Sequence, residues 1–106
     1  MKPHVFHPLA DAEYTAAATR YASIDPELGG RFYDEIERLI LRIRSQPTLY
    51  RQFDPPARRI LSTVFPYSVI YFEQPDRIWI VAVMHAKQRP GYWRERMERQ
   101  APAADD

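Results

Sequence analysis

Residues 58–93, RRILSTVFPYSVIYFEQPDRIWIVAVMHAKQRPGYW, decide the fold of this chain. Apolar side chains alternate through residues 64–73 and occupy both faces, a pattern typical of a central strand that is covered on both sides. Residues 74–76 predict a turn, residues 77–85 a last long strand, and residues 57–62 a shorter strand before them. The stretch therefore predicts a three-strand meander that ends in basic and aromatic residues.

The two long strands are expected to divide their side chains between two faces, because successive side chains of a strand point to opposite sides. On the central strand, one face is predicted to carry Phe65, Tyr67, Val69 and Tyr71, and the other Ser68, Ile70 and Phe72. On the last strand, strict alternation predicts Trp79, Val81, Val83 and His85 on one face, and Ile78, Ile80, Ala82 and Met84 on the other.

The first quarter of the chain predicts a short strand and a helix. Residues 4–6 are expected to form a strand that ends at His7-Pro8, because proline cannot donate to a ladder but fits the first turn of a helix. Helical spacing of small and aromatic residues predicts a first helix over residues 8–23. Asp11 and Glu13 are expected near its start, where carboxylates complement the helix dipole.

A second helix is predicted from Asp25-Pro26, which supplies an N-cap and a first-turn proline, and it is expected to end before Pro47. Gly29 and Gly30 lie in its first turn, where their low helix propensity matters least or where another backbone comes close. The short connection predicts an antiparallel helix hairpin. Residues 49–56 are expected to form a loop.

The order of these elements predicts an α+β fold, β-α-α-β-β-β, in which the helix hairpin covers one face of a small, mostly antiparallel sheet. A short C-terminal helical segment over residues 90–99 is expected to fold back and bury Tyr92 and Trp93. One domain is expected over residues 1–99, since 106 residues close around a single core, with a flexible tail at residues 100–106.

Composition narrows the class of protein. Hydrophobic residues make up 45% and charged residues 27%, which excludes the disordered class, and the absence of cysteine excludes disulfides and thiolate metal sites. The first ten residues lack the apolar core of a signal peptide, and no apolar run is long enough to span a membrane. A cytoplasmic protein without a membrane partner is expected.

Charge is distributed unevenly along the chain. Residues 1–50 carry six basic and seven acidic side chains, whereas residues 51–99 carry nine basic and five acidic ones. The basic half is suited to phosphates or to an acidic polypeptide, or its arginines are ordinary solvated side chains.

Several short motifs follow one another at characteristic places in the predicted elements. They are Gly30-Arg31-Phe32, Gln46-Pro47, Arg59, Phe65-Pro66-Tyr67, the run at residues 80–85, Arg89-Pro90 and Tyr92-Trp93. Over residues 3–97, this set resembles the RelE/ParE superfamily of bacterial toxins from type II toxin-antitoxin modules, and in particular its ParE and plasmid-stabilisation branch.

The resemblance implies a growth-inhibiting toxin that binds a cellular target, with DNA gyrase implied by the ParE branch. It also implies a cognate antitoxin protein that neutralises the toxin in a hetero-oligomer and makes the only contact with DNA. Two alternatives stay open. One is a ribosome-dependent mRNA endoribonuclease of the RelE type, and the other is a non-toxic remnant that only binds the antitoxin.

The candidate site lies at the end of the meander. RNA cleavage by a ribose 2′-hydroxyl needs a base, a proton donor and cations around the phosphate. An RNase would draw these groups from His85, Arg89, Tyr92 and Arg59. A surface that binds the target or the antitoxin would draw on Arg59, Lys87, Arg89, Tyr92, Trp93 and Arg96. The alternative for each residue is structural, as a hydrogen-bonded strand end, a packing anchor or half of an ion pair.

Aromatic residues suggest a second surface. Some of them are expected to line a groove that the antitoxin covers, or all of them to form a thick aromatic core; the set is Phe6, Tyr14, Tyr21, Tyr67, Tyr71, Phe72, Trp79 and Trp93. No cofactor or metal is expected, because the sequence has no phosphate-binding glycine loop and no carboxylate or cysteine completes a ligand set with His4 and His7.

Overall fold

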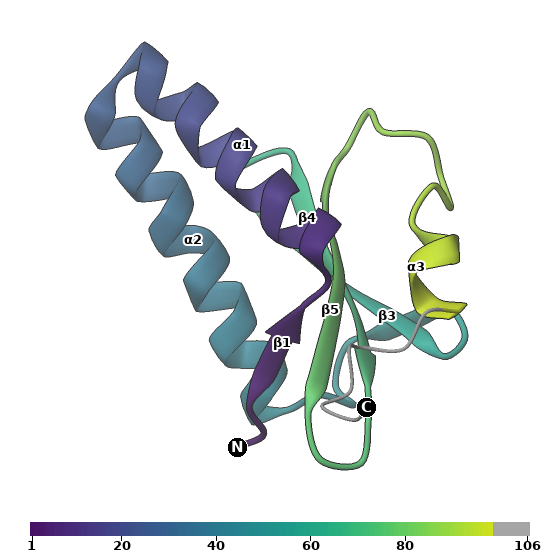
Figure 1. Ribbon diagram of the computed structural model, residues 1–106. Helices are drawn as coiled ribbons and strands as arrows, with labels where there is room; N and C mark the ends of the chain where they lie inside the picture. The colour runs from purple at the N-terminus through teal and green to yellow at the C-terminus, as the bar shows by residue number, and fades with distance from the viewer. Residues whose placement is uncertain (99–106) are drawn as a thin grey trace.

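A sheet with a helix hairpin on one side forms the framework of the computed structural model, which describes residues 1–98 (Figure 1). The predicted α+β class and element order are confirmed, with one added strand. The predicted tail at residues 100–106 lies outside the described residues. The elements are β1 (His4–Phe6), α1 (Pro8–Ile24), α2 (Pro26–Ser45), β2 (Arg51–Asp54), β3 (Ala57–Leu61), β4 (Tyr67–Glu73), β5 (Ile78–His85) and α3 (Arg94–Glu98).

The five strands lie in the order β1-β5-β4-β3-β2. β1 pairs in parallel with the first residues of β5, and the other neighbours are antiparallel. α1 and α2 cover one face, while the C-terminal segment with α3 returns to the other (Figure 1). No helix in the described part of the chain is long and apolar enough to cross a membrane.

β2 corrects the prediction of a loop over residues 49–56. Arg51 pairs with Arg59 and Gln52 with Arg58, so a polar strand forms the edge of the sheet through its backbone. Arg51 and Gln52 are exposed, and the alternation of apolar and polar residues that marks a half-buried strand is missing. An edge strand of this kind carries charge and stays short, which explains why periodicity does not reveal it.

A bulge in β5 corrects the predicted faces of the last strand. Ile70 of β4 pairs with Ala82, but the next residue, Tyr71, pairs with Ile80, so Val81 is an extra residue on β5. Val81 and Ala82 therefore lie on the side away from the helices, and Val83 joins Ile78 and Ile80 on the helix side. The faces predicted for the central strand are confirmed: Tyr67, Val69 and Tyr71 face the helices, and Ile70 and Phe72 face away.

The aromatic residues form a thick core. Tyr14, Tyr67, Tyr71, Trp79 and Trp93 are buried, and Phe6, Tyr21 and Phe72 are partly buried. Phe32 is fully buried and lies 5.0 to 5.2 Å, centre to centre, from the rings of Tyr67, Tyr21 and Phe65. Ring pairs of this kind contribute about 0.5–1.5 kcal/mol each beyond their buried area. The structure therefore favours the core interpretation of these aromatics.

The helix hairpin depends on a close approach at Gly29. A Cβ atom built on Gly29 would lie 2.6 Å from Ala22 Cβ and 2.8 Å from Ala22 Cα on α1, whereas a Cβ atom on Gly30 would meet nothing within 4 Å. Asp25 starts α2 as predicted, since its Oδ1 accepts a hydrogen bond of 3.0 Å from the backbone N–H of Glu27.

Candidate functional site

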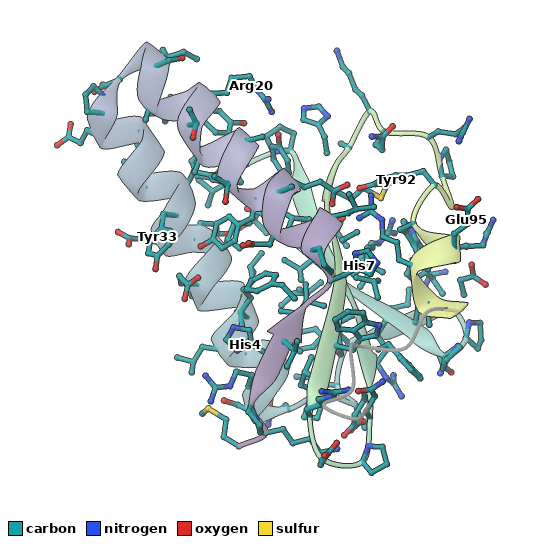
Figure 2. The ribbon with its side chains drawn as sticks, viewed as in Figure 1. His4, His7, Arg20, Tyr33, Tyr92 and Glu95 are labelled. Atoms are coloured by element: carbon teal, nitrogen blue, oxygen red, sulfur yellow. The ribbon has the colours of Figure 1, made fainter. Side chains whose placement is uncertain are left out.

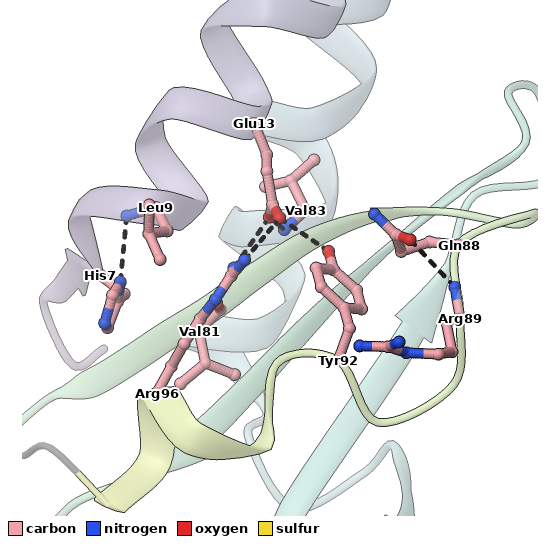
Figure 3. Close-up of polar contacts among 9 residues, drawn as sticks. All are labelled: His7, Leu9, Glu13, Val81, Val83, Gln88, Arg89, Tyr92 and Arg96. Atoms are coloured by element: carbon pink, nitrogen blue, oxygen red, sulfur yellow. Dashed lines mark hydrogen bonds and ion pairs between the residues drawn. The ribbon is translucent and has the colours of Figure 1, made fainter.

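Glu13 on α1 is the centre of the polar contacts at the end of the meander (Figure 3). Its Oε2 accepts hydrogen bonds of 2.8 Å from the Tyr92 hydroxyl and 2.8 Å from Arg96 Nη2. Its Oε1 accepts from the backbone N–H of Val83 at 3.0 Å and from Arg96 Nη1 at 3.1 Å. One carboxylate thus joins α1, β5 and the C-terminal segment.

The geometry follows from the short β1 strand and the bulge. β1 ends at Phe6, which pairs with Ile80, and beyond this point no described strand lies on that side of β5. Side chains take the place of a strand there, because Glu13 binds the Val83 N–H and Arg96 Nη1 donates to the Val81 carbonyl at 2.9 Å. The open edge of β5 is satisfied by an ion pair instead of a ladder.

Tyr92 and Arg96 are held inside this cluster. Burial, and then the hydrogen bond to Glu13, raise the pKa of the Tyr92 phenol above its ordinary value. Tyr92 is therefore a neutral donor at neutral pH, and a phenol in this state does not act as a base. The Arg96 side chain is 10% exposed, and its guanidinium lies 4.9 Å from the centre of the Tyr92 ring. Its charge is directed at Glu13.

His85, at the end of β5, lies on the helix side of the sheet. Its Nδ1 accepts a hydrogen bond of 2.9 Å from the backbone N–H of Lys87. Its ring meets the Tyr67 ring edge-on, with the centres 5.0 Å apart. The Tyr67 hydroxyl in turn accepts a hydrogen bond from Arg20 Nη2 at 2.5 Å, and burial raises the pKa of Tyr67. Arg20 extends from α1 near the loop that follows β5 (Figure 2).

A loop connects β5 to the C-terminal segment and carries the exposed cations. Lys87 and Arg89 are both exposed, and the Arg89 backbone N–H donates to Gln88 Oε1 at 3.0 Å (Figure 3). Gly91 has a φ of 76°, in the left-handed region that favours glycine, and turns the chain toward Tyr92. Between this loop, β5 and α1 is a cavity of about 180 Å³.

Arg59 and Trp93 lie on the opposite face of the sheet from His85. Arg59 pairs with Ile70, whose side chain faces away from the helices, and the Arg59 guanidinium lies 4.9 Å from the centre of the Phe53 ring. Trp93 is 1% exposed and packs edge-on against Phe53 at 5.6 Å. The predicted set is therefore divided: His85, Tyr92 and Arg96 approach α1, while Arg59 does not join them. Trp93 has no surface open to a partner in this structure.

Glu13 and Arg20 were not among the predicted site residues. Both belong to α1 and are seven positions apart, which places them on one face of the helix, two turns from each other. The sequence suggests only that Glu13 complements the helix dipole. One sequence feature could have identified them as site residues. They are an acidic and a basic residue beside Ala10, Tyr14 and Ala17, which are buried, on a helix that is otherwise rich in small residues. Among residues 1–98, no three His, Cys, Asp or Glu side chains gather into a group that holds a metal ion.

Comparison with known families decides the identity. A family model described as the ParE toxin of the type II toxin-antitoxin system parDE matches residues 5–90. The chain belongs to the ParE toxin family. The predicted RelE/ParE resemblance is thereby confirmed, and with it the role of a ParE toxin of a type II toxin-antitoxin system.

A solved structure supports the ParE fold. It is a chain of the chromosomal ParDE TA system from P. aeruginosa, and it matches with a TM-score of 0.71 at 16% sequence identity. The match covers 82% of this chain and 98% of the other, so nearly the whole of that chain has its counterpart here. A search of curated proteins finds no match.

Proposed function

We propose that this ParE toxin inhibits growth in the cytoplasm by binding a cellular macromolecule, with DNA gyrase as the target, and that a cognate antitoxin neutralises it. The observation that carries the binding mode is the contact set of Glu13. Tyr92, which an RNase site would draw on, donates to that carboxylate at 2.8 Å, and Arg96 is paired with the same carboxylate at 2.8 Å. Gyrase itself is inferred from membership of the ParE family.

The remaining candidates do not complete an RNase site by themselves. In the neutral tautomer that accepts from Lys87 at Nδ1, His85 carries its proton on Nε2 and offers no second basic nitrogen. Arg59 faces the other side of the sheet, over Phe53. What is left near His85 is a set of donors and cations, which is suited to binding an anionic group. This arrangement supports an inhibitor that acts by contact.

The experiment compares two activities of the purified chain. Gyrase supercoiling is expected to be inhibited at micromolar toxin, and mRNA on programmed ribosomes is expected to stay intact. His85→Ala and Arg89→Ala are tested in both assays. If the wild type instead cleaves mRNA and leaves supercoiling unchanged, and the two variants do not cleave, the chain is an endoribonuclease.

Neutralisation is tested by expression in cells. The chain is expressed alone and together with the protein encoded by the adjacent reading frame. We expect growth arrest in the first case, rescue in the second, and a stable complex on co-purification. Normal growth in the first case, with a complex still formed, would mean that the chain is a non-toxic remnant.

A further inference from the structure

The cavity of about 180 Å³ between α1 and the end of β5 has walls whose hydrogen-bond acceptors are already engaged. Glu13 receives hydrogen bonds from Tyr92, Arg96 and the Val83 backbone. His85 Nδ1 accepts from the Lys87 backbone, and the Gln88 oxygen accepts from the Arg89 backbone. The Tyr67 oxygen accepts from Arg20. The bonds of Glu13 and Tyr67 join α1 to other elements, whereas those of His85 and Gln88 are local bonds to the backbone one or two residues further on.

The donors on the same wall are not used up in this way. The Tyr67 hydroxyl keeps its own hydrogen after accepting from Arg20. His85 carries a hydrogen on Nε2 whether it is neutral or protonated, since Nδ1 is the acceptor when the ring is neutral. The Gln88 amide keeps its NH₂ group, and the Arg20 guanidinium keeps the rest of its five N–H bonds. A wall with engaged acceptors and remaining donors selects an acceptor-rich ligand.

The charges around the cavity favour a ligand with a single negative charge. The Glu13 carboxylate is paired with Arg96 at 2.8 Å, so these two residues cancel. Arg20 then contributes one uncompensated positive charge beside the cavity, and it is exposed to solvent. Lys87 and Arg89 on the adjoining loop are exposed as well and add to the positive potential outside.

We infer that this cavity binds one carboxylate side chain of a polypeptide partner, and we assign that partner to the antitoxin; this assignment rests on the proposed function. At about 180 Å³ the cavity is below the roughly 300–1,000 Å³ of small-molecule sites and suits a single side chain. Ala16 and Val83 line it with apolar surface for a methylene stem. A phosphodiester needs room for a sugar on each of two ester oxygens, whereas a carboxylate side chain needs room for one methylene stem.

The first test uses small anions on the purified chain, so it does not depend on the antitoxin. Side-chain NMR signals of Arg20, His85 and Gln88 are followed at constant ionic strength with sodium acetate, with dimethyl phosphate as a phosphodiester of the same charge, and with chloride. Acetate is expected to shift these signals saturably, and the shifts are expected to vanish in Arg20→Gln. Shifts no larger than those with chloride, or tighter binding of dimethyl phosphate, would overturn the assignment, the latter in favour of nucleic acid.

The second test measures binding of the protein encoded by the adjacent reading frame. Arg20→Gln and Gln88→Glu are each expected to weaken its affinity about tenfold or more, because each removes or opposes a charge-assisted hydrogen bond. Arg51→Gln on the exposed edge strand is the matched control and is expected to bind like the wild type. Tyr67→Phe keeps the buried ring but removes the hydroxyl and with it the bond from Arg20, so it is expected to weaken the affinity as well.

The two proposals fail in different ways. If that protein binds wild type and Arg20→Gln equally well, the carboxylate site is wrong and the toxin-antitoxin pairing stands. If it binds neither protein, the toxin-antitoxin pairing is wrong, and so is the assignment of the cavity to the antitoxin. Saturable binding of acetate would then still establish a carboxylate site, for another polypeptide.

Discussion

The Tyr92 hydroxyl donates a hydrogen bond of 2.8 Å to Glu13 Oε2 and so connects two residues that are 79 positions apart in the sequence. Arg96 adds an ion pair to the same carboxylate, with only 10% of its side chain exposed. Together they fasten the C-terminal segment to the first helix across the edge of the sheet. These contacts fix Tyr92 and Arg96 beside α1, while Trp93 between them is held on the other face by its packing against Phe53.

Glu13→Gln is expected to destabilise the fold by about 1–3 kcal/mol, because Arg96 would keep its buried charge and lose its ionic partner. Glutamine keeps one acceptor oxygen, for either Val83 or Tyr92, because these two bind different oxygens of Glu13. Both hydrophobic clusters stay intact, so the global fold should survive. Urea denaturation measures the change, and hydrogen exchange of the α3 amides should show early opening. Glu95→Gln, an exposed change on α3, is the control (Figure 2). An unchanged urea midpoint in Glu13→Gln would contradict the prediction.

Gly29→Ala and Gly30→Ala are expected to change stability in opposite directions. Both replacements improve helix propensity by about 1 kcal/mol. At Gly29 the added methyl would meet Ala22 Cβ at 2.6 Å and force α1 and α2 apart, whereas at Gly30 it meets nothing within 4 Å. We expect a loss of about 1–3 kcal/mol for the first and a gain of up to about 1 kcal/mol for the second. Thermal unfolding of the two proteins side by side provides the measurement, and equal effects would exclude the close approach.

Stability is expected to fall at alkaline pH. Burial raises the pKa of Tyr14, Tyr71 and Tyr92 above the ordinary value of 10.0. The unfolded chain therefore loses these protons first, so the stabilisation is complete below about pH 10 and decreases as the pH rises toward the folded-state pKa values. Tyr92→Phe should make the decrease shallower in urea titrations at increasing pH. Tyr33→Phe, which removes a phenol from a residue that is 51% exposed, is the control for the hydroxyl.

At acid pH the loss of stability is expected to depend on Glu35, whose side chain is 7% exposed. The hydrogen bonds from Arg38 at 2.9 and 3.1 Å, followed by the one from Ser62, lower the pKa of Glu35 below its ordinary value of 4.5. The unfolded chain therefore takes up the proton first. The stabilisation is complete above the ordinary value and disappears as the pH falls through the folded-state pKa.

Glu35→Gln should accordingly be less stable than the wild type at neutral pH and should lose less stability on acidification. Circular dichroism during urea titrations at several acidic pH values measures both effects. Asp34→Asn, a change at the exposed neighbouring position, is the matched control. If Glu35→Gln loses as much stability on acidification as the wild type, the acid sensitivity belongs to other carboxylates.

Most of the fold is predictable because its elements bury apolar faces of regular period. The helices and the long strands have that signal. β2 does not, because it pairs through its backbone and leaves Arg51 and Gln52 in solvent. The bulge at Val81 is also hidden, since residues 78–84 are apolar throughout and no polar residue marks where the alternation changes face. The sequence therefore predicts the strand but not the side on which Val83 and His85 lie.

The candidate site is less predictable than the fold. His85 and Tyr92 can be selected because basic and aromatic residues gather after a strand. Glu13 is distant in sequence, and its role depends on how far β1 extends along β5 and on the return of the C-terminal segment. Neither the extent of β1 nor the return of the C-terminal segment can be recognised from a local sequence pattern. Arg59 shows the converse, because it belongs to a recognisable motif while its side chain lies on the other face.

The fastening at Glu13 also has a consequence for synthesis. A ribosome adds about 5–20 residues per second, so the 79 positions between Glu13 and Tyr92 take roughly 4 to 16 s to translate. During that interval a nascent chain carries the first helix without the residues that bind its carboxylate. The cavity beside Arg20 has no closing wall until the last part of the chain has left the exit tunnel. A translation intermediate that lacks Gln88 and Tyr92 therefore lacks one wall of this cavity.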